Sequence, residues 1–344
     1  MAKRTLEETL NLDEILAEQK EMAKFKISDA DYHEVSAEII EYVSPGQKAM
    51  GWLRELPDFR DYNINTDIDA VDEKRKAKGV RSGVKEMALE VGVLNAPSLP
   101  ASANLTQWFS PIEDQGSLGS CTANAGAGVI EYFERRAFGN HIDASRLFLY
   151  KATRNLLNWT GDTGAYLRTT MEALTVFGVC PEKYWPYRIT GFDSEPTAFC
   201  YSFAQNYQSI SYFRHDTPGI NPNDLLQQIK AWIAAGIPAM FGFTCYTSLN
   251  QASTSGKIPF PSPGENVIGG HAVVAAGYDD RITITNRNNG AKTTGALLIR
   301  NSWGTGWGNN GYGWLPYEYI LRRLAVDWWS LIKAEWINTR NFGL

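Results

Sequence analysis

The chain has 344 residues, 44% of them hydrophobic, which is enough for one large domain or for two lobes around a packed core. Its 11 Trp, 16 Tyr and 15 Phe exclude a disordered chain. A formal net charge of −5 argues against a nucleic-acid partner, which would need a concentrated basic face.

The charge is concentrated at the N-terminus. Residues 1–50 hold 6 Lys or Arg against 11 Asp or Glu, whereas residues 101–344 are almost balanced. We therefore interpret residues 1–97 as an acidic, partly helical N-terminal extension with a role of its own. Apolar stripes predict two helices within residues 6–43, and a short helix is expected within residues 83–95. Two prolines in the stretch 96–102 predict an extended linker.

Large aromatic residues and glycines dominate after residue 105. The pattern predicts a helix over 121–139, and we expect it to be buried. Its Gly126 and Gly128 each cost about 1 kcal/mol relative to alanine, a cost tolerated where another element approaches closely. Gly139 is expected to end this helix. Further helices are predicted over 167–178 and 221–236, the second capped by Asn223.

Strand patterns dominate the rest of the chain, over residues 238–246, 271–279, 281–286, 295–303 and 311–320. A helical half followed by a β half predicts an α+β fold of two lobes with a cleft between them.

Location and redox state follow from what the sequence lacks. No stretch has the apolar length of a signal peptide or approaches the roughly 20 apolar residues of a membrane span. Four scattered cysteines, at positions 121, 180, 200 and 245, are too few for a disulfide scaffold. We expect a reduced, cytoplasmic protein without a membrane span, with export by a route that uses no cleaved signal left open. No spacing of Cys and His suits zinc, so we expect no metal and no organic cofactor.

One cysteine lies where its thiol can be activated. Cys121 begins the predicted helix after a Gly/Ser-rich turn, and both a helix N-terminus and a nearby imidazolium lower the pKa of a thiol. His271 follows Gly269 and Gly270 and opens an apolar strand, where its ring can face a cleft. The remaining histidines are expected on the solvated surface: His33, His141 and His215.

Three further side chains complete a reactive group. A catalytic imidazole needs a third group to fix its tautomer, and Asn301 stands at the end of a predicted strand, 30 residues after His271. Trp303 is placed to shield that hydrogen bond from water. Gln115 lies six residues before Cys121 and can fold back, so that its amide joins the Cys121 backbone N–H as an oxyanion donor. The order and spacing of Cys, His and Asn approximate those of papain-like enzymes.

Three blocks resemble the catalytic blocks of the papain family of cysteine peptidases: PIEDQGSLGSCTANA, GGHAVVAAGYDD and LIRNSWGTGWGNNGYGWLPYEYI. Residues 149–187 are similar to the left-lobe segment of its bacterial and viral members. The resemblance runs from about residue 100 to the C-terminus. It implies a peptidase domain over 98–344, with a helical left lobe at about 113–225 and an antiparallel β-barrel-like right lobe at about 226–344.

The resemblance also implies a role for each matching residue. Cys121 would be the nucleophile, His271 the acid and base, and Asn301 the group that orients the imidazole. Gln115 would be the oxyanion donor. For substrate binding it implies the covering Trp303 and a backbone contact at Gly164, and Gly270 suggests an open pocket.

Two departures from the family pattern affect packing. Leu118 replaces the cysteine three residues before the nucleophile, and Thr122 replaces a tryptophan. The first removes half of the family's left-lobe disulfide. We therefore interpret Cys180 and Cys200 as buried thiols or as a bridge to each other.

The sequence thus predicts a cysteine endopeptidase that hydrolyses polypeptides through a thioester acyl-enzyme. As in a zymogen, part of residues 50–97 is expected to pack on or across the cleft and restrain activity. A solvated extension for partner binding or targeting is the alternative for that segment. For the site, the alternatives are an acyl transferase or ligase, or an inactive module that only binds peptides.

Overall fold

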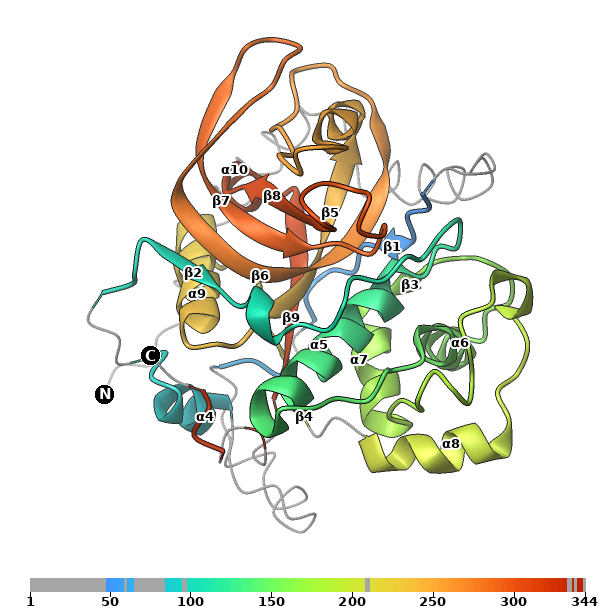
Figure 1. The fold of residues 1–344 in the computed structure, drawn as a ribbon. Coiled ribbons are helices and arrows are strands. Elements are labelled where there is room, and N and C mark those ends of the chain that lie inside the picture. The colour runs from blue at the N-terminus through green and yellow to red at the C-terminus, as the bar shows by residue number, and fades with distance from the viewer. Residues whose placement is uncertain are drawn as a thin grey trace, which may run out of the picture.

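The computed structural model describes residues 48–58, 61–64, 84–94, 98–207, 211–332, 336 and 339–342 (Figure 1). The two helices expected within residues 6–43, and His33 with them, lie outside the described residues. The described chain forms a helical lobe and a sheet-bearing lobe, which meet along one long helix (Figure 1). This arrangement confirms the predicted two-lobe α+β fold.

The helical lobe is built around α5 (Cys121–Phe138). Gly139 ends this helix in a left-handed conformation with φ of 78°, as predicted. The predicted helix over 167–178 is α7 (Leu167–Val176). Two helices of this lobe were not predicted, and both are capped by hydroxyl side chains: α6 (Arg146–Leu156) by Ser145, and α8 (Ala198–Ala204) by Thr197.

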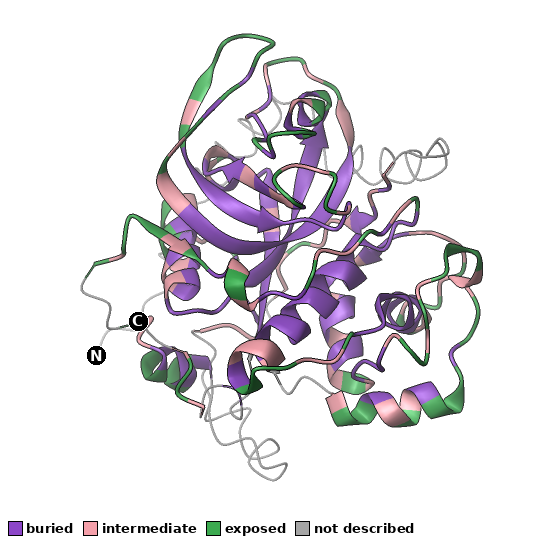
Figure 2. Cartoon of the chain, viewed as in Figure 1, coloured by how far each residue is buried: buried purple, intermediate pink, exposed green. Residues whose placement is uncertain are grey.

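Helix α5 is buried along most of its length (Figure 2), and its glycines explain why this is sterically allowed. A Cβ at Gly128 would lie 2.5 Å from the guanidinium of Arg300, and one at Gly126 would lie 3.1 Å from Leu149. The expected close approach of other elements to this helix is therefore confirmed.

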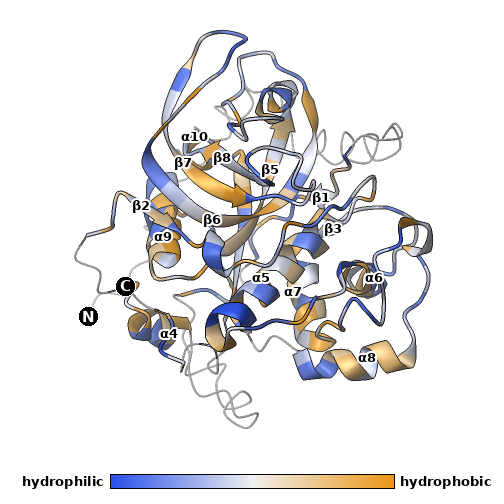
Figure 3. Ribbon diagram, viewed as in Figure 1, coloured by the Kyte–Doolittle hydropathy of each residue, from blue (hydrophilic) through white to orange (hydrophobic). Residues whose placement is uncertain are grey.

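The second lobe carries a seven-stranded antiparallel sheet in the order β4-β9-β5-β6-β7-β8, with β2 paired to β6. Figure 3 shows hydrophobic residues along β5 and β7, whose side chains enter the core. No pairing among the described strands joins β8 back to β4, so the sheet is open and only loosely barrel-like. The strands are β2 (Ser102–Asn104), β4 (Ser211–Arg214), β5 (Ala239–Tyr246), β6 (Val267–Thr285), β7 (Lys292–Arg300), β8 (Tyr312–Pro316) and β9 (Ala325–Ile332).

The structure corrects three of the predicted strands. The strands expected over 271–279 and 281–286 form one strand, β6, whose register with β7 shifts between Asp279 and Thr283. The strand expected over 311–320 ends at Pro316, and the chain continues into the short helix α10 (Glu318–Leu321). Strand β9 was not predicted.

The predicted helix over 221–236 is α9 (Pro222–Ala234), which packs against β6, β2 and α10. Its cap is Asn221 and not Asn223: the Asn221 side chain accepts a hydrogen bond from the Asn223 backbone N–H. The reason is that Pro222 takes the first helical position, so the cap lies two residues before the predicted one. The predicted lobe boundary at residue 225 falls inside this helix.

The prediction for His215 is wrong. This residue directly follows β4 and is fully buried, with Nε2 2.8 Å from the Ser330 hydroxyl. Its polar neighbours suggested a loop, but Arg214 and Asp216 pair with each other in the interior. Burial lowers the pKa of His215 to about 3, so the ring is neutral.

The described cysteines are all free and buried, which confirms the reading of Cys180 and Cys200 as buried thiols. The helices of the described residues include none that is both long and apolar enough to cross a membrane. Among the described side chains, no group of three or more His, Cys, Asp or Glu is placed to hold a metal ion.

Two described parts of the N-terminal extension pack against the rest of the chain. The short helix expected within 83–95 is α4 (Val84–Glu90). Strand β1 (Trp52–Leu53) pairs in parallel with β3 (Ala165–Tyr166) of the helical lobe, next to the N-terminal end of α5 (Figure 1). Residues 48–53, which contain β1, are called the covering segment below.

Candidate active site

The four predicted catalytic residues come together from four segments of the chain. Gln115 lies in the turn before α5, Cys121 is the first residue of α5, His271 lies in β6, and Asn301 follows β7. The backbone N–H of Ala272 donates to Cys121 Sγ at 3.4 Å, which brings β6 to the start of α5. The helical lobe thus supplies the thiol and the sheet supplies the imidazole.

The ring of His271 is held on two sides. Its Nε2 lies 2.7 Å from Asn301 Oδ1, and the indole of Trp303 stacks on it at 4.4 Å between ring centroids and 24° between ring planes. Asn301 Oδ1 also accepts the backbone N–H of Ser302, which fixes the orientation of the amide. His271 Nδ1 is buried and has no hydrogen-bond partner among the described residues.

Burial determines the protonation of the cysteine and the histidine. The thiol of Cys121 is fully buried, and this burial raises its pKa to about 11, although the backbone N–H groups of Ala272 and Gly51 lower it in part. Burial also lowers the pKa of His271 to about 4, partly offset by its hydrogen bond with Asn301. The closed site therefore holds a neutral thiol and a neutral imidazole. The thiolate–imidazolium pair expected from the helix N-terminus is not favoured while water is excluded.

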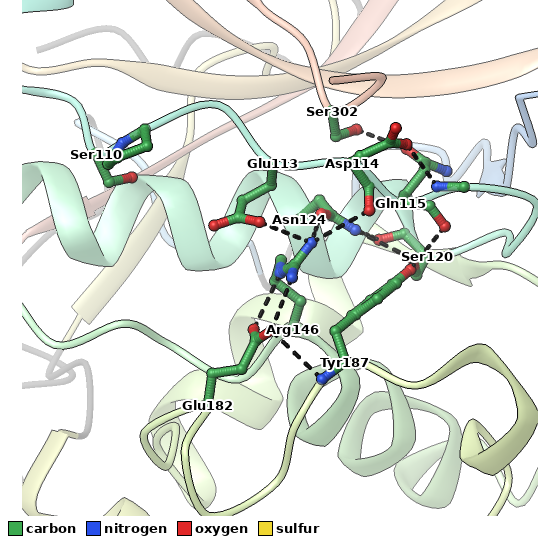
Figure 4. Close-up of polar contacts among 12 residues, drawn as sticks. Ser110, Glu113, Asp114, Gln115, Ser120, Asn124, Arg146, Glu182, Tyr187 and Ser302 are labelled. Carbon is green, nitrogen blue, oxygen red and sulfur yellow. Dashed lines mark hydrogen bonds and ion pairs between the residues drawn. The ribbon is translucent and has the colours of Figure 1, made fainter. Parts of the chain in front are cut away.

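Gln115 is oriented by contacts at both ends of its amide. Oε1 accepts the Ser302 hydroxyl at 2.6 Å, while Nε2 donates to Leu118 O at 2.9 Å and to Ala49 O at 3.1 Å. Figure 4 shows this residue between Ser302 and the turn before α5. The phenol of Tyr187 binds the backbone carbonyl of Gln115 at 3.0 Å and thereby supports the turn from below.

A buried arginine that sequence analysis missed ties this turn to the helical lobe. The guanidinium of Arg146 pairs with Glu182 at 2.9 Å and with Glu113 at 3.0 Å, and it stacks over the Tyr187 ring at 4.1 Å (Figure 4). It is 6% exposed, so these are desolvated contacts. Arg146 lies inside α6, which was itself not predicted, and this is why no signal pointed to it.

Asp162 is a second residue that sequence analysis missed. Both of its carboxylate oxygens accept the Gly119 backbone N–H, at 3.0 and 3.1 Å, and it accepts the Tyr150 hydroxyl at 2.6 Å. The same hydroxyl accepts the Gly164 backbone N–H at 3.0 Å. Asp162 therefore holds the turn before Cys121 and the Gly164 strand at a fixed separation.

The covering segment lies against the predicted catalytic residues. Ala49 donates its N–H to Gly116 O at 3.2 Å, and its carbonyl accepts from both Gln115 Nε2 and Trp303 Nε1. The backbone N–H of Gly51 lies beside Cys121 and lowers the pKa of its thiol. Trp303 therefore contacts both His271 and the covering segment.

Glycines allow the close approach of the covering segment to the helical lobe. Ala165 donates its N–H to Gly51 O at 2.8 Å. A Cβ at Gly164, where φ is 72°, would lie 2.3 Å from that carbonyl oxygen, and one at Gly51 would lie 1.9 Å from Gly119 O. The edge expected to bind substrate at Gly164 is thus occupied by the chain itself. Gly270 lies in β6 opposite Thr244 and next to His271.

The side chain of Trp52 enters the sheet-bearing lobe. It is 1% exposed, its Nε1 donates to Asp327 Oδ2 at 3.0 Å, and its ring lies where a Cβ at Gly242 would be 1.8 Å away. Just beyond β1, Arg168 of α7 pairs with Glu55 and with Asp61, the latter at 2.8 Å. Among the described residues, the Trp52 side chain and the carboxyl groups of Glu55 and Asp61 therefore help to anchor the extension.

Comparison with known proteins places this geometry in a family. A family model described as papain family cysteine protease matches residues 99–319. The chain belongs to the papain family of cysteine proteases. This membership makes it a peptidase, and it confirms the family resemblance of the three sequence blocks.

Individual relatives agree with this assignment. An uncharacterized peptidase C1-like protein of Acanthamoeba polyphaga mimivirus is 33% identical over 298 residues, which cover 85% of this chain and 89% of that protein. The structure of xylellain, a cysteine protease from Xylella fastidiosa, is 31% identical with a TM-score of 0.63, covering 84% of this chain and 97% of xylellain. Digestive procathepsin L 3 of Tenebrio molitor shares the fold, with a TM-score of 0.53, 18% identity and coverage of 77% and 88%.

Proposed function

We propose that this papain-family peptidase is a cysteine endopeptidase that uses Cys121 as nucleophile, and that its own covering segment restrains it. The restraint rests on one observation above all. The carbonyl of Ala49 takes the amide donor of Gln115, while the N–H of Gly51 points at Cys121 Sγ.

The reaction follows from the positions of the side chains. Once the cleft opens, Cys121 Sγ gives its proton to the unpartnered Nδ1 of His271 and attacks the peptide carbonyl carbon, because Nε2 is held by Asn301. The oxyanion receives hydrogen bonds from Gln115 Nε2 and from the Cys121 backbone N–H. His271 returns the proton to the leaving amine, which gives a thioester. Water, deprotonated by the same ring, then hydrolyses the thioester and releases the thiol.

The covering segment blocks this sequence without itself being a good substrate. The group of the covering segment beside the Cys121 sulfur is the backbone N–H of Gly51, which is not an electrophile that the sulfur could attack. The oxyanion donor of Gln115 is meanwhile engaged by a ground-state carbonyl. Exclusion of water also keeps the thiol and the imidazole neutral. All three effects lower the reactivity of the closed site.

The extension stays in place through contacts away from the nucleophile. Truncating a buried tryptophan to alanine costs about 3–5 kcal/mol in a protein core, and Trp52 is the largest fully buried side chain among the described residues of the extension. Trp52→Ala in the full-length chain should therefore release the covering segment. Leu56→Ala is the matched control, because the Leu56 side chain is 57% exposed and belongs to the same extension.

The test is cleavage of a mixed peptide library under reducing conditions. Trp52→Ala is expected to cleave peptides at least about tenfold faster than the wild type and Leu56→Ala, and Trp52→Ala/Cys121→Ala should be inactive. Equal rates for the wild type and Trp52→Ala would refute the restraint. Activity that survives Cys121→Ala would refute the assigned nucleophile.

The transferase or ligase alternative uses the same thioester, and a competing amine separates the two outcomes. Adding an amino-acid amide to the Trp52→Ala reaction should leave free carboxylic acid as the main product if water resolves the thioester. Amide products in excess would favour acyl transfer instead.

A further inference from the structure

The pocket that holds Trp52 has features that a purely structural tryptophan does not require. One wall is Gly242 of β5, which lies opposite Ala272 of β6 and opposite Val326 of β9. Ala272 donates its backbone N–H to Cys121 Sγ. The wall of the pocket is therefore paired with a residue that contacts the nucleophile. Gly242 has ordinary backbone geometry, so what the glycine provides here is space for a flat ring.

The far end of the pocket is the carboxylate of Asp327, which is fully buried. Its Oδ1 is satisfied inside the lobe: it accepts Trp329 Nε1 at 2.7 Å and lies 3.3 Å from the guanidinium of Arg214. Its Oδ2 faces Trp52 Nε1, the one donor to that oxygen in the described part of the chain. When Trp52 leaves, a buried carboxylate oxygen loses its partner, at a cost of the order of 1–3 kcal/mol or more.

The charges around this carboxylate disfavour a cationic replacement. Arg214 pairs with Asp216 as well as with Asp327, and Arg168 loses both of its carboxylate partners when the extension leaves. Two arginines and two aspartates then remain around the pocket, which balances the charge. A third cation would leave an unbalanced charge buried in the pocket, whereas the neutral N–H of an aromatic ring donates to Oδ2 without adding charge.

We infer that this pocket selects substrates, and that the peptidase prefers a tryptophan side chain there, with Asp327 as the specificity-determining residue. The covering segment then works as an internal mimic: it places in the pocket the side chain that the pocket is built to take. The inference rests on the proposed peptidase function, because it assigns the pocket to the same cleft.

The test uses the full-length Trp52→Ala chain, in which the pocket is empty, and peptides that move one variable residue along an otherwise constant sequence. The variable residue is tryptophan, leucine, or 3-benzothienylalanine, which keeps the bicyclic ring but replaces the N–H by sulfur. At one position near the cleaved bond, tryptophan should be preferred over both others by at least about tenfold in kcat/KM. A preference below about twofold for the N–H ring over the sulfur ring overturns the inference.

Asp327→Asn in the same background is the sharpest variant. The Asn oxygen stays with Trp329 and Arg214, which need an acceptor, so its NH₂ faces the pocket where Oδ2 was. Two donors would then meet, and the preference for tryptophan over benzothienylalanine should vanish or reverse. A retained preference would show that Asp327 does not read the side chain.

A steric variant keeps the test decisive if Asp327→Asn does not fold. Gly242→Ala adds a Cβ where the ring lies, and its backbone geometry permits alanine. Circular dichroism and thermal melting confirm the fold, and the loss of activity should then be confined to peptides with large aromatic side chains. A uniform loss for all peptides, or none, overturns the inference.

Binding separates this inference from the proposed function. Isothermal titration calorimetry of the same peptides on Trp52→Ala/Cys121→Ala needs no catalysis. Tighter binding of the tryptophan peptide without any cleavage by the Trp52→Ala chain would support the pocket and refute the peptidase assignment. Cleavage by Trp52→Ala without a tryptophan preference would support the peptidase assignment and refute the role of the pocket.

Discussion

The backbone N–H of Gly51 lies beside the sulfur of Cys121, where it lowers the pKa of the thiol. This contact joins the N-terminal extension to the first residue of α5, and it is made possible by a glycine whose Cβ would collide with Gly119 O at 1.9 Å. The nucleophile is therefore covered by a donor that belongs to its own chain.

Gln115 should matter for rate once the cleft is open. Its amide is fixed by the bond between Oε1 and Ser302. In the closed site Nε2 donates to Leu118 O and to the Ala49 carbonyl, and a substrate oxyanion would replace the second of these. Gln115→Ala in the Trp52→Ala background should lower kcat by about 10²–10³, with a smaller change in KM. Steady-state kinetics measure this, with the exposed Gln227→Ala on α9 as control. Equal kcat values for the two variants would remove Gln115 from the mechanism.

The restraint should weaken as pH rises. Burial raises the pKa of Glu55 to about 7 from its usual 4.5, a shift that Arg168 only partly offsets. The docked extension therefore binds a proton that the released extension does not hold above pH 4.5. Docking is favoured fully below that pH, and this contribution is lost as pH rises through about 7.

The measurement is the ratio of wild-type activity to Trp52→Ala activity between pH 5 and pH 8, because the ratio cancels the pH dependence of the chemistry. The ratio should rise with pH in the wild type and stay flat in Glu55→Gln, whose side chain cannot ionise. A ratio that falls with pH would show that another group controls docking, since Arg168, Arg214 and Asp327 also act on Glu55.

Replacing Gly128 by alanine should weaken the packing between the two lobes. A Cβ there would lie 2.5 Å from Arg300 Nη1, and Arg300 cannot yield freely because its Nη2 donates to Ser110 Oγ at 3.1 Å and to Pro111 O at 2.8 Å. Gly128→Ala should lower the free energy of unfolding by about 1–3 kcal/mol in denaturant titration. Gly306→Ala, where the added Cβ has no neighbour within 4 Å, should change it by less than about 0.5 kcal/mol.

The elements with strong local signals were predictable from sequence. Helix α5 was predicted correctly because a Gly/Ser turn precedes Cys121 and because Gly139 follows the last turn of the helix. The residues of the site were found through their motifs and spacing, although their roles remain predictions. Strand β9 was missed because Ala325 and residues 327–331 are all buried, so this part of the strand lacks the alternation that identifies a strand.

Other features depend on contacts that no local pattern reveals. His215 is buried because Arg214 and Asp216 neutralise each other in the interior, which polar composition alone cannot show. Asp327 is the more important case. Nothing in the stretch AVDWWSLI indicates that its carboxylate meets an indole 275 residues earlier in the chain. The neutral state of the closed site also required the structure, since the covering segment excludes the water that a charged pair needs.

The reactivity of Cys121 itself tests most directly whether the covering segment restrains the peptidase. Native full-length protein and Trp52→Ala are treated with iodoacetamide, and alkylation of each cysteine is followed by mass spectrometry, with the buried Cys245 as internal reference. If the covering segment closes the site, Cys121 should react as slowly as Cys245 in the wild type and at least about tenfold faster in Trp52→Ala. Equal, fast alkylation of Cys121 in both proteins would contradict the restraint, because the covering segment would then not close the site in solution.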